Sequence, residues 1–291
     1  MKKKYSLNDL MKESEKYDKS IYSTKMFDLD NSLDYIQSSK ISDISIKRDI
    51  SKGSNTFYTD YVLERASNPY KTYFGKKIKL NDLKRLKNKQ KDFIEVLRKR
   101  KSHRKYLKKD LSSYEIFSIL NYSYGISREE NVMGHKWQFR YSPSPGGIYS
   151  SDIYLILVNS HFKKGLYHYQ PKDNSLELIK EGDFSSFIKD NLGLSPYIDS
   201  ENKIGGCIII SSNIQRLYIK YNVRAYRFML LEVGILLQSL SLVSSYIGIG
   251  SCILGGFYEN KINDFIGLDG DLESVQGVMV IGHIDNEESE N

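Results

Sequence analysis

The sequence has few of the residues that mark a secreted scaffold or a metal site. It holds two cysteines among 291 residues, which excludes a disulfide framework and favours a reduced, cytoplasmic setting. The five histidines show no metal-ligand spacing with each other or with the cysteines, so no metal site is expected. The N-terminus is basic and then polar, without the apolar stretch of a signal peptide.

Internal repeats and low-complexity linkers are also missing. The most apolar segment, Phe228 to Ile249, contains Glu232, Gln238 and four serines, so we expect a buried core helix and no membrane span. An apolar fraction of 40% is ordinary for a globular protein. The length suits one large domain, or a domain with an extension.

Positive charge is concentrated in one block. Lys71 to Lys109 holds 17 Lys/Arg and three acids, which leaves 26 basic and 33 acidic residues elsewhere, out of totals of 43 and 36. Such a block is a solvated helix face, a dock for an anionic ligand or peptide, or a nucleic-acid surface. No RNA- or DNA-reading motif accompanies it, so nucleic-acid binding is not expected.

The periodicity predicts helices mixed with strands in no regular alternation, which is typical of the α+β class. Helices are expected over Asn81–Leu97, Leu111–Ser123, Phe184–Leu192 and about Tyr221–Ile247. Strands are expected over Trp137–Tyr141, Asp152–Val158, Gly165–Gln170, Leu176–Ile179, Gly206–Ser211 and Gly277–Ile284. Gly206–Ser211 is nearly all apolar, as in a central strand buried on both faces.

Three segments are expected in chain order. Residues 1–75 are predicted to be an N-terminal helical extension that packs on the main domain. Residues 76–284 are predicted to be that domain, and residues 285–291 an acidic tail.

Two glycine-containing or basic segments are candidate ligand sites. RKSHR, Arg100 to Arg104, offers cations and a hydroxyl that can hold a phosphate, or it is a solvated basic run. In PSPGG, Pro143 to Gly147, the two prolines have fixed φ angles and the two glycines let a ligand approach the backbone closely. Alternatively, the segment is an ordinary turn.

The stretch from Ile219 to Phe257 holds two further candidates. Lys220 and Tyr221 lie at the expected start of a helix. The lysine is a possible base and the tyrosine a phenol that orients or relays a proton. Alternatively, they are a surface lysine and a core tyrosine. GIGSCILGGF, which ends at Phe257, is a glycine loop that can aim a backbone N–H at a cofactor, or a helix cap and a turn. Glu232 is expected to pair with Arg227 or Arg224.

In this order the motifs R-x-S-x-R, P-S-x-G-G, K-Y-x-x-R-A-Y-R and G-x-G-S-x-x-x-G-G-F make the chain resemble the SagB-type, McbC-like azoline dehydrogenases of the nitroreductase-like flavoprotein superfamily. The resemblance runs from about Tyr35 to Ile284. It implies a central, mostly antiparallel sheet flanked by helices, and an intertwined homodimer that binds FMN at the subunit interface.

The resemblance also implies roles for particular residues. The FMN phosphate would be held by Arg100, Lys101, Ser102 and Arg104. The isoalloxazine would be lined by Pro143, Ser144 and Gly146, and a backbone N–H of the loop Leu254, Gly255, Gly256 would lie near flavin N5. Lys220 would be the base, with Tyr221 orienting or relaying the proton. Pro145 stands where the family often has alanine, which would stiffen the loop.

The implied reaction is oxidation of peptide thiazolines or oxazolines to thiazoles or oxazoles, with the flavin reoxidised by O2. The implied setting is biosynthesis of an azole-containing ribosomal peptide such as a bacteriocin, toxin or thiopeptide. The implied partners are the precursor peptide, a cyclodehydratase and a leader-peptide-binding protein. Two alternatives stay open, a generic NAD(P)H-dependent FMN nitroreductase or quinone reductase, and a non-catalytic scaffold of the same fold.

Overall fold

The computed structural model describes residues 35, 36, 38–40, 56–80, 92–192 and 203–285. The chain divides into two compact units, Met1–Ser42 and Asp43–Asn291, and the fold below is that of the second unit. The domain boundaries expected after residues 75 and 284 stay predictions. Residues 81–91 of the first expected helix and 286–291 of the acidic tail lie outside the described residues.

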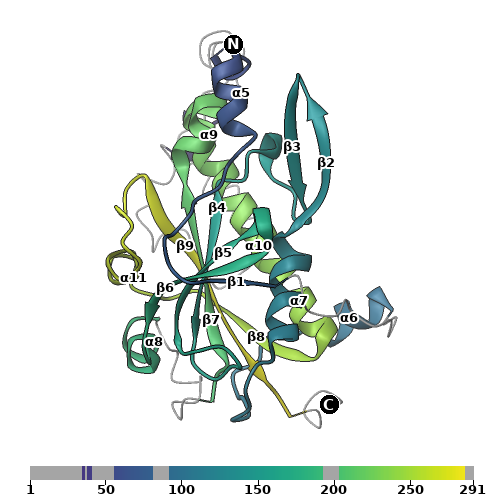
Figure 1. Cartoon of the computed structure of the whole chain (residues 1–291), viewed down its shortest axis with the longest axis vertical. Coiled ribbons are helices and arrows are strands. Elements are labelled where there is room, and N and C mark those ends of the chain that lie inside the picture. The colour runs from purple at the N-terminus through teal and green to yellow at the C-terminus, as the bar shows by residue number, and fades with distance from the viewer. Residues whose placement is uncertain (1–34, 37, 41–55, 81–91, 193–202, 286–291) are drawn as a thin grey trace, which may run out of the picture. The chain divides into compact units, whose positions relative to one another are not determined.

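An antiparallel sheet forms the centre of this unit (Figure 1). Among the described residues it has seven strands in the order β1-β6-β5-β4-β7-β9-β8, and each neighbouring pair is antiparallel. The strands are β1 (Lys77–Lys79), β4 (Ser151–Leu157), β5 (Gly165–Gln170), β6 (Ser175–Glu181), β7 (Gly206–Asn213), β8 (Ile249–Leu254) and β9 (Glu273–His283). A separate ribbon pairs β2 (Ile126–Val132) with β3 (His135–Arg140).

Helices flank the sheet, which confirms the expected α+β architecture. They are α5 (Asp60–Ala66), α6 (Phe93–Lys99), α7 (Ser113–Tyr124), α8 (Ser185–Asn191), α9 (Ile214–Tyr221), α10 (Ala225–Ile247) and α11 (Glu259–Ile266). Ser112 caps α7, because its Oγ accepts from the Glu115 backbone N–H at 3.2 Å while Glu115 Oε2 accepts from the Ser112 N–H at 2.7 Å.

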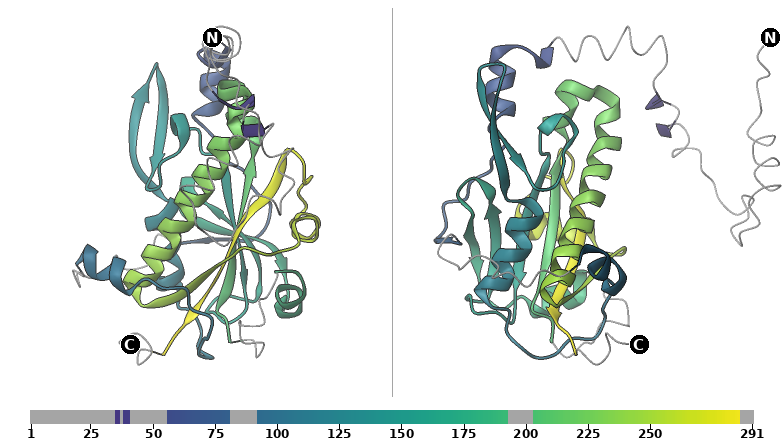
Figure 2. Two further views of the ribbon diagram at one scale, coloured as in Figure 1. Left: turned by 180° about the vertical axis from the view of Figure 1, so that it is seen from behind. Right: turned by 90° about the vertical axis from the view of Figure 1, so that its right-hand side faces the viewer.

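Alternate residues of the buried strands fill two apolar layers. On one face, Ile208 and Ile210 of β7 pack with residues of α7 and α10, which lie together against the sheet (Figure 2). On the other face, Cys207 and Ile209 pack with residues of α8 and α11. Since both faces are covered, β7 is apolar along most of its length, as predicted for Gly206–Ser211.

A third apolar cluster closes the end of the molecule where α5, α9 and the β2–β3 ribbon meet (Figure 1). It joins Phe57 and Leu63 to Trp137, Leu217 and Met229. This cluster holds α5 against α9.

The observed elements differ from the expected ones around the long helix. The helix expected over about Tyr221–Ile247 is α10, which begins at Ala225 after a short 3-10 turn, Asn222–Arg224, and the expected glycine loop is largely the strand β8. Strand β9 begins at Glu273, four residues before the expected start. The strands β1 and β2 and the helices α9 and α11 were not expected.

One helical stretch of the described residues, Ile214–Ile247, is long and apolar enough to cross a membrane by length and composition. A core helix passes the same test, so the finding is weak by itself. Here Leu236 and Leu240 of α10 are fully buried in the core.

Candidate functional site

Lys220 and Tyr221 lie in the last turn of α9, so the expectation that they begin a helix is wrong. Asn213 caps the start of α9 by accepting a hydrogen bond from the Gln215 N–H at 3.0 Å. Asn222 adopts a φ of 49° and ends the helix, and a short 3-10 turn then leads into α10. A positive φ is uncommon for a residue with a side chain. The lysine and the tyrosine therefore sit at a fixed break before the core helix.

The PSPGG turn faces this break. Pro145 begins a 3-10 turn in which Gly146 has a φ of 63° and Gly147 a φ of 67°, values that favour glycine. A Cβ placed on Gly146 would lie 2.6 Å from Tyr221 Oη and 3.0 Å from Lys220 Nζ. The structure thus brings together the predicted residues Gly146, Lys220 and Tyr221, and the missing side chain makes room for the other two.

Aromatic rings surround the lysine. Lys220 Nζ lies 4.3 Å from the ring centroid of Phe57, 5.3 Å from that of Tyr58 and 5.5 Å from that of Tyr221. Rings at these distances stabilise a cation and hold the side chain in place. Burial, with a smaller contribution from Tyr58, raises the pKa of Tyr221, so its hydroxyl keeps its proton at neutral pH.

The buried carboxylate of Glu232 holds the turn from the other side. Its Oε2 accepts a hydrogen bond from Ser144 Oγ at 2.5 Å, and its Oε1 accepts from Ser151 N–H at 3.0 Å and Ser151 Oγ at 2.8 Å. Ser150 Oγ donates to the same oxygen at 3.1 Å. The predicted arginine partner is therefore wrong, because hydroxyl and backbone donors satisfy this carboxylate. Ser144 Oγ in turn accepts from the Tyr149 N–H at 2.8 Å.

The basic segment Arg100–Arg104 lies along β8. Ser102 forms a parallel bridge with Ser251, and the His103 N–H donates to the Ser251 carbonyl at 2.9 Å. The exposed side chains of the segment are Lys101, Ser102 and Arg104, and that of Arg100 is half-buried. Cations and a hydroxyl accessible from solvent are the groups that bind a phosphate.

The glycines after β8 are open to a ligand. Leu254 is buried, whereas Gly255 and Gly256 are exposed, and a Cβ on either would meet no described atom within 4 Å. Nothing in the described part of the chain requires glycine there through crowding. A flat ligand that contacts the backbone at this place would require glycine, because a Cβ would keep the ligand away from the main chain.

The predicted site residues therefore form two groups at opposite ends of α10 (Figure 1). Lys220, Tyr221 and Gly146 lie before its first turn, whereas Arg100–Arg104 and Gly255 lie next to the strand that follows its last turn. The helix has 23 residues, which corresponds to about 34 Å at 1.5 Å per residue. One chain does not bring the two groups together.

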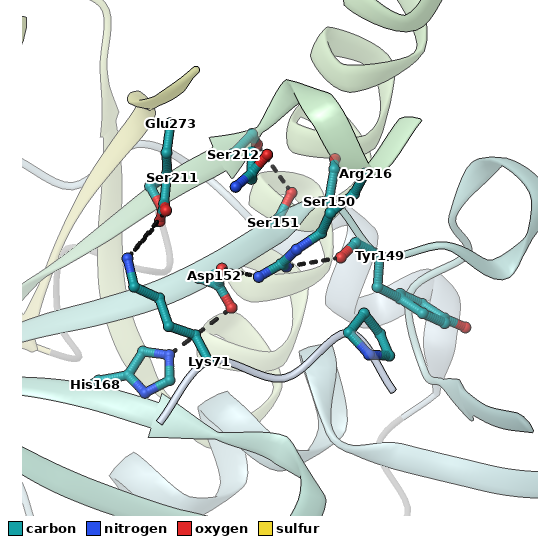
Figure 3. Close-up of polar contacts among 12 residues, drawn as sticks. Lys71, Tyr149, Ser150, Ser151, Asp152, His168, Ser211, Ser212, Arg216 and Glu273 are labelled. Carbon is teal, nitrogen blue, oxygen red and sulfur yellow. Dashed lines mark hydrogen bonds and ion pairs between the residues drawn. The ribbon is translucent and has the colours of Figure 1, made fainter. Parts of the chain in front are cut away.

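A buried ionic network beside α9 was missed by the sequence reasoning (Figure 3). Asp152 of β4 accepts from Arg216 Nη2 at 2.9 Å and lies 3.8 Å from His168 Nε2. His168 Nδ1 is 2.9 Å from Glu177 Oε2 on the neighbouring strand. The only signal in the sequence was polar residues at alternate positions of apolar strands, which is too common to single them out.

The network keeps its members charged. Burial alone raises the pKa of Asp152, but Arg216 and His168 outweigh it, so the pKa lies below its ordinary value. Burial alone lowers the pKa of His168, but the carboxylates of Asp152 and Glu177 outweigh it, so the pKa is raised. Arg216 Nη1 also donates to the Tyr149 carbonyl at 3.1 Å, which ties α9 to the end of the PSPGG turn.

Known proteins share this fold. A protein of Methanocaldococcus jannaschii named as a nitroreductase is 28% identical over 191 residues, which are 65% of this chain and 88% of that protein. A crystal structure of a nitroreductase-like protein from Anabaena variabilis superposes with a TM-score of 0.69 at 22% identity. It covers 89% of this chain, which spans about half (47%) of the Anabaena chain.

A second solved structure is the Escherichia coli microcin synthetase McbBCD complex with truncated pro-MccB17 bound. One of its chains superposes with a TM-score of 0.53 at 19% identity, over 93% of this chain and 100% of that chain. The family model described as "Nitroreductase family" matches residues 97–283, which is more than half of the sequence. The chain therefore belongs to the nitroreductase family of flavin oxidoreductases.

Proposed function

We propose that this protein is an FMN-dependent dehydrogenase that oxidises thiazoline or oxazoline rings of a ribosomal peptide to thiazoles or oxazoles. The observation that carries the proposal is the convergence of Lys220 Nζ and Tyr221 Oη on Gly146. A lysine and a protonated phenol at one glycine turn are suited to removing a carbon-bound proton. The fold likeness to a chain of a peptide-modifying complex agrees with this substrate class.

The two groups of residues fit FMN. Arg100, Lys101, Ser102 and Arg104 would hold the phosphate through charge-assisted hydrogen bonds, since their side chains are accessible. The exposed backbone of Gly255 and Gly256 after Leu254 would contact the edge of the ring system. Pro143 and Gly146 would contact its face, whereas the Ser144 hydroxyl is used by Glu232 and positions the turn.

Lys220 acts as the base in the proposed reaction. Its unprotonated amine takes the Cα proton of the ring, the Tyr221 hydroxyl orients or relays that proton, and the rings around Nζ stabilise the ammonium ion that forms. A hydride leaves the neighbouring ring carbon as the carbon–carbon double bond forms, so the ring loses two hydrogens. When bound, FMN supplies the hydride acceptor, and O2 removes the two electrons and is reduced to hydrogen peroxide.

A second copy of the chain would complete the site. Because α10 separates the two groups by its length, a twofold dimer with antiparallel α10 helices would place the anchor of one copy beside the lysine of the other. The face of α10 and the turn before it carry exposed apolar residues that suit such a contact. These are Val223, Tyr226, Leu230, Leu231 and Ile235.

The wider setting is part of the same proposal. The precursor peptide would arrive with azoline rings made by a cyclodehydratase and would be held by a leader-peptide-binding protein, all in the cytoplasm. Thiazoline and oxazoline substrates fit the proposed chemistry equally, because both rings lose the same two hydrogens.

The test begins with the purified protein. We expect flavin absorption bands, release of FMN identified by mass, and elution as a dimer. A synthetic peptide with one thiazoline should lose the mass of two hydrogens and yield one equivalent of hydrogen peroxide in air. A protein that binds FMN but leaves the ring unchanged would overturn the proposed reaction.

A second candidate is an NAD(P)H-dependent nitroreductase or quinone reductase, which the Methanocaldococcus relative favours. Rapid bleaching of the bound flavin by NADH or NADPH without oxygen, together with an unchanged thiazoline peptide, would establish it. A colourless protein that takes up no added FMN would leave the scaffold interpretation.

A further inference from the structure

We propose that a groove between α5 and α9 binds the peptide residues that flank the ring; this inference rests on the proposed function. The groove encloses about 430 Å³ and is lined by α5, the segment that follows it and the first turns of α9. Its volume lies in the ~300–1,000 Å³ range of ligand pockets. Its principal lining residues are Tyr61, Asn68, Tyr70, Asn213, Gln215 and Ile219.

The groove adjoins the proposed base. Ile148 lines it, and the position of a Cβ on Gly146 is 3.5 Å from Ile148 Cδ1 and 3.0 Å from Lys220 Nζ. Arg216, which also lines the groove, lies four residues before Lys220 and therefore one turn away on the same face of α9. A chain lying in the groove would present its next residue beside the lysine.

The lining suits the main chain of a peptide. The side-chain amides of Asn68, Asn213 and Gln215 and two phenol hydroxyls offer both donors and acceptors, and Ile219 supplies apolar contact. Among the described residues that line the groove there is no carboxylate. Two arginines also line the groove. Arg216 pairs with Asp152 at 2.9 Å, and Arg65 donates to Tyr61 Oη at 2.6 Å, so both guanidiniums are already held by neighbouring side chains.

One wall of the groove lies before the part of the chain that the family model matches. The family match starts at residue 97, whereas Tyr61 to Tyr70 precede it. This wall is held rigidly, because Val62 and Leu63 of α5 are buried in the cluster with Leu217, and Tyr70 Oη donates to Gln138 Oε1 at 2.5 Å. A preformed wall favours binding, because fewer groups have to be ordered when the peptide enters.

The test compares two probes on the FMN-loaded protein. One is a heptapeptide with a central thiazoline, and the other is a capped single thiazoline without flanking residues. The wild type should show kcat/KM at least about tenfold higher for the heptapeptide, a preference worth roughly 1.4 kcal/mol. Gln215→Trp fills the groove and should abolish the preference while the rate with the short probe stays unchanged.

Tyr218→Trp is the matched control, because Tyr218 is exposed on the same helix and does not line the groove. It should keep the preference, and flavin content should be equal in all three proteins. A wild type without preference, or a Gln215→Trp variant that retains it, would overturn the groove and leave the proposed function intact.

Absence of ring oxidation by the wild type would instead count against the proposed function. Binding of a fluorescein-labelled heptapeptide, measured by fluorescence anisotropy, then tests the groove independently of ring oxidation. Weaker binding by Gln215→Trp with normal binding by Tyr218→Trp supports the groove, and equal binding by all three proteins rejects it.

Discussion

The two ends of α10 are built in different ways. At the N-terminal end, Lys220 and Tyr221 crowd the side-chain-free Gly146, and a buried apolar cluster around Phe57 supports them. At the C-terminal end, Arg100–Arg104 follow an edge strand through backbone hydrogen bonds and expose their cations. The protein thus fixes its proposed proton-transfer groups before a ligand arrives and leaves its proposed phosphate anchor open.

The largest expected difference between the ends follows from Lys220→Ala. Removing the proposed base should lower the rate of ring oxidation by about 10²–10⁴-fold, the usual range for general acid–base catalysis. FMN content should stay at the wild-type level, because the anchor lies at the other end. The measurement is kcat by mass spectrometry beside the flavin-to-protein ratio, and a full rate with FMN bound would show that another group is the base.

A pair of glycine substitutions compares the ends directly. Gly146→Ala puts a methyl group 2.6 Å from Tyr221 Oη at a φ of 63°, and the left-handed backbone alone costs about 1–2 kcal/mol. Gly255→Ala meets no described atom within 4 Å. Urea unfolding should show a loss of stability for Gly146→Ala only, whereas FMN titration should show weaker binding for Gly255→Ala. An equal loss of stability in the two variants would show that the two ends of α10 do not differ in rigidity.

Arg104→Ala tests the open end alone. A hydrogen bond to a charged group contributes about 1.5–3 kcal/mol, so the Kd for FMN should rise by at least about tenfold. Added salt should weaken FMN binding less in the variant than in the wild type, because one screened contact is gone. Fluorescence titration at two salt concentrations measures both effects, and an unchanged Kd would place the phosphate elsewhere.

The smallest expected effect concerns pH and the network under α9. The folded pKa of His168 is raised, so its stabilising contribution is complete below an unfolded pKa of about 6.5 and is lost as pH rises through the folded pKa. The folded pKa of Asp152 is lowered, so its contribution is present above about pH 3.9 and is lost as pH falls.

Urea unfolding at a series of pH values measures how the contributions of His168 and Asp152 to stability depend on pH. The free energy of unfolding should fall on the alkaline side in the wild type and should change less there in His168→Gln. FMN affinity should not follow the same curve, since the anchor is at the far end. Parallel pH curves for the two proteins would show that His168 does not titrate as described.

Local patterns predicted much of this fold. The apolar run of β7 and the helical periodicity of α7 depend on neighbours in sequence, so their residues alone identify them. The Lys220–Tyr221 pair and the PSPGG turn were recognised for the same reason, because residue type and order define them. Their convergence on Gly146 was not predicted, because it needs the break at Asn222 and that break has no glycine or proline.

Contacts distant in sequence explain the misses. Strand β8 was interpreted as a loop because of its glycines, yet a Cβ on Gly250 would lie 3.2 Å from His103 Cβ and 2.2 Å from Ile284 Cγ2. Glu232 was assigned an arginine partner on charge alone, whereas Ser144 and Ser151, more than 80 residues away, satisfy it. Neither arrangement leaves a mark on the surrounding sequence.

The length of α10 has a consequence for genetics as well as for structure. In the proposed dimer each site takes its anchor from one copy and its base from the other, so defects at the two ends should complement. A mixed dimer of a Lys220→Ala copy and an Arg104→Ala copy would contain one site with both defects and one site with none. When FMN is limiting, so that the Arg104→Ala protein is poorly loaded, the two impaired proteins, co-expressed, should then recover part of the wild-type activity.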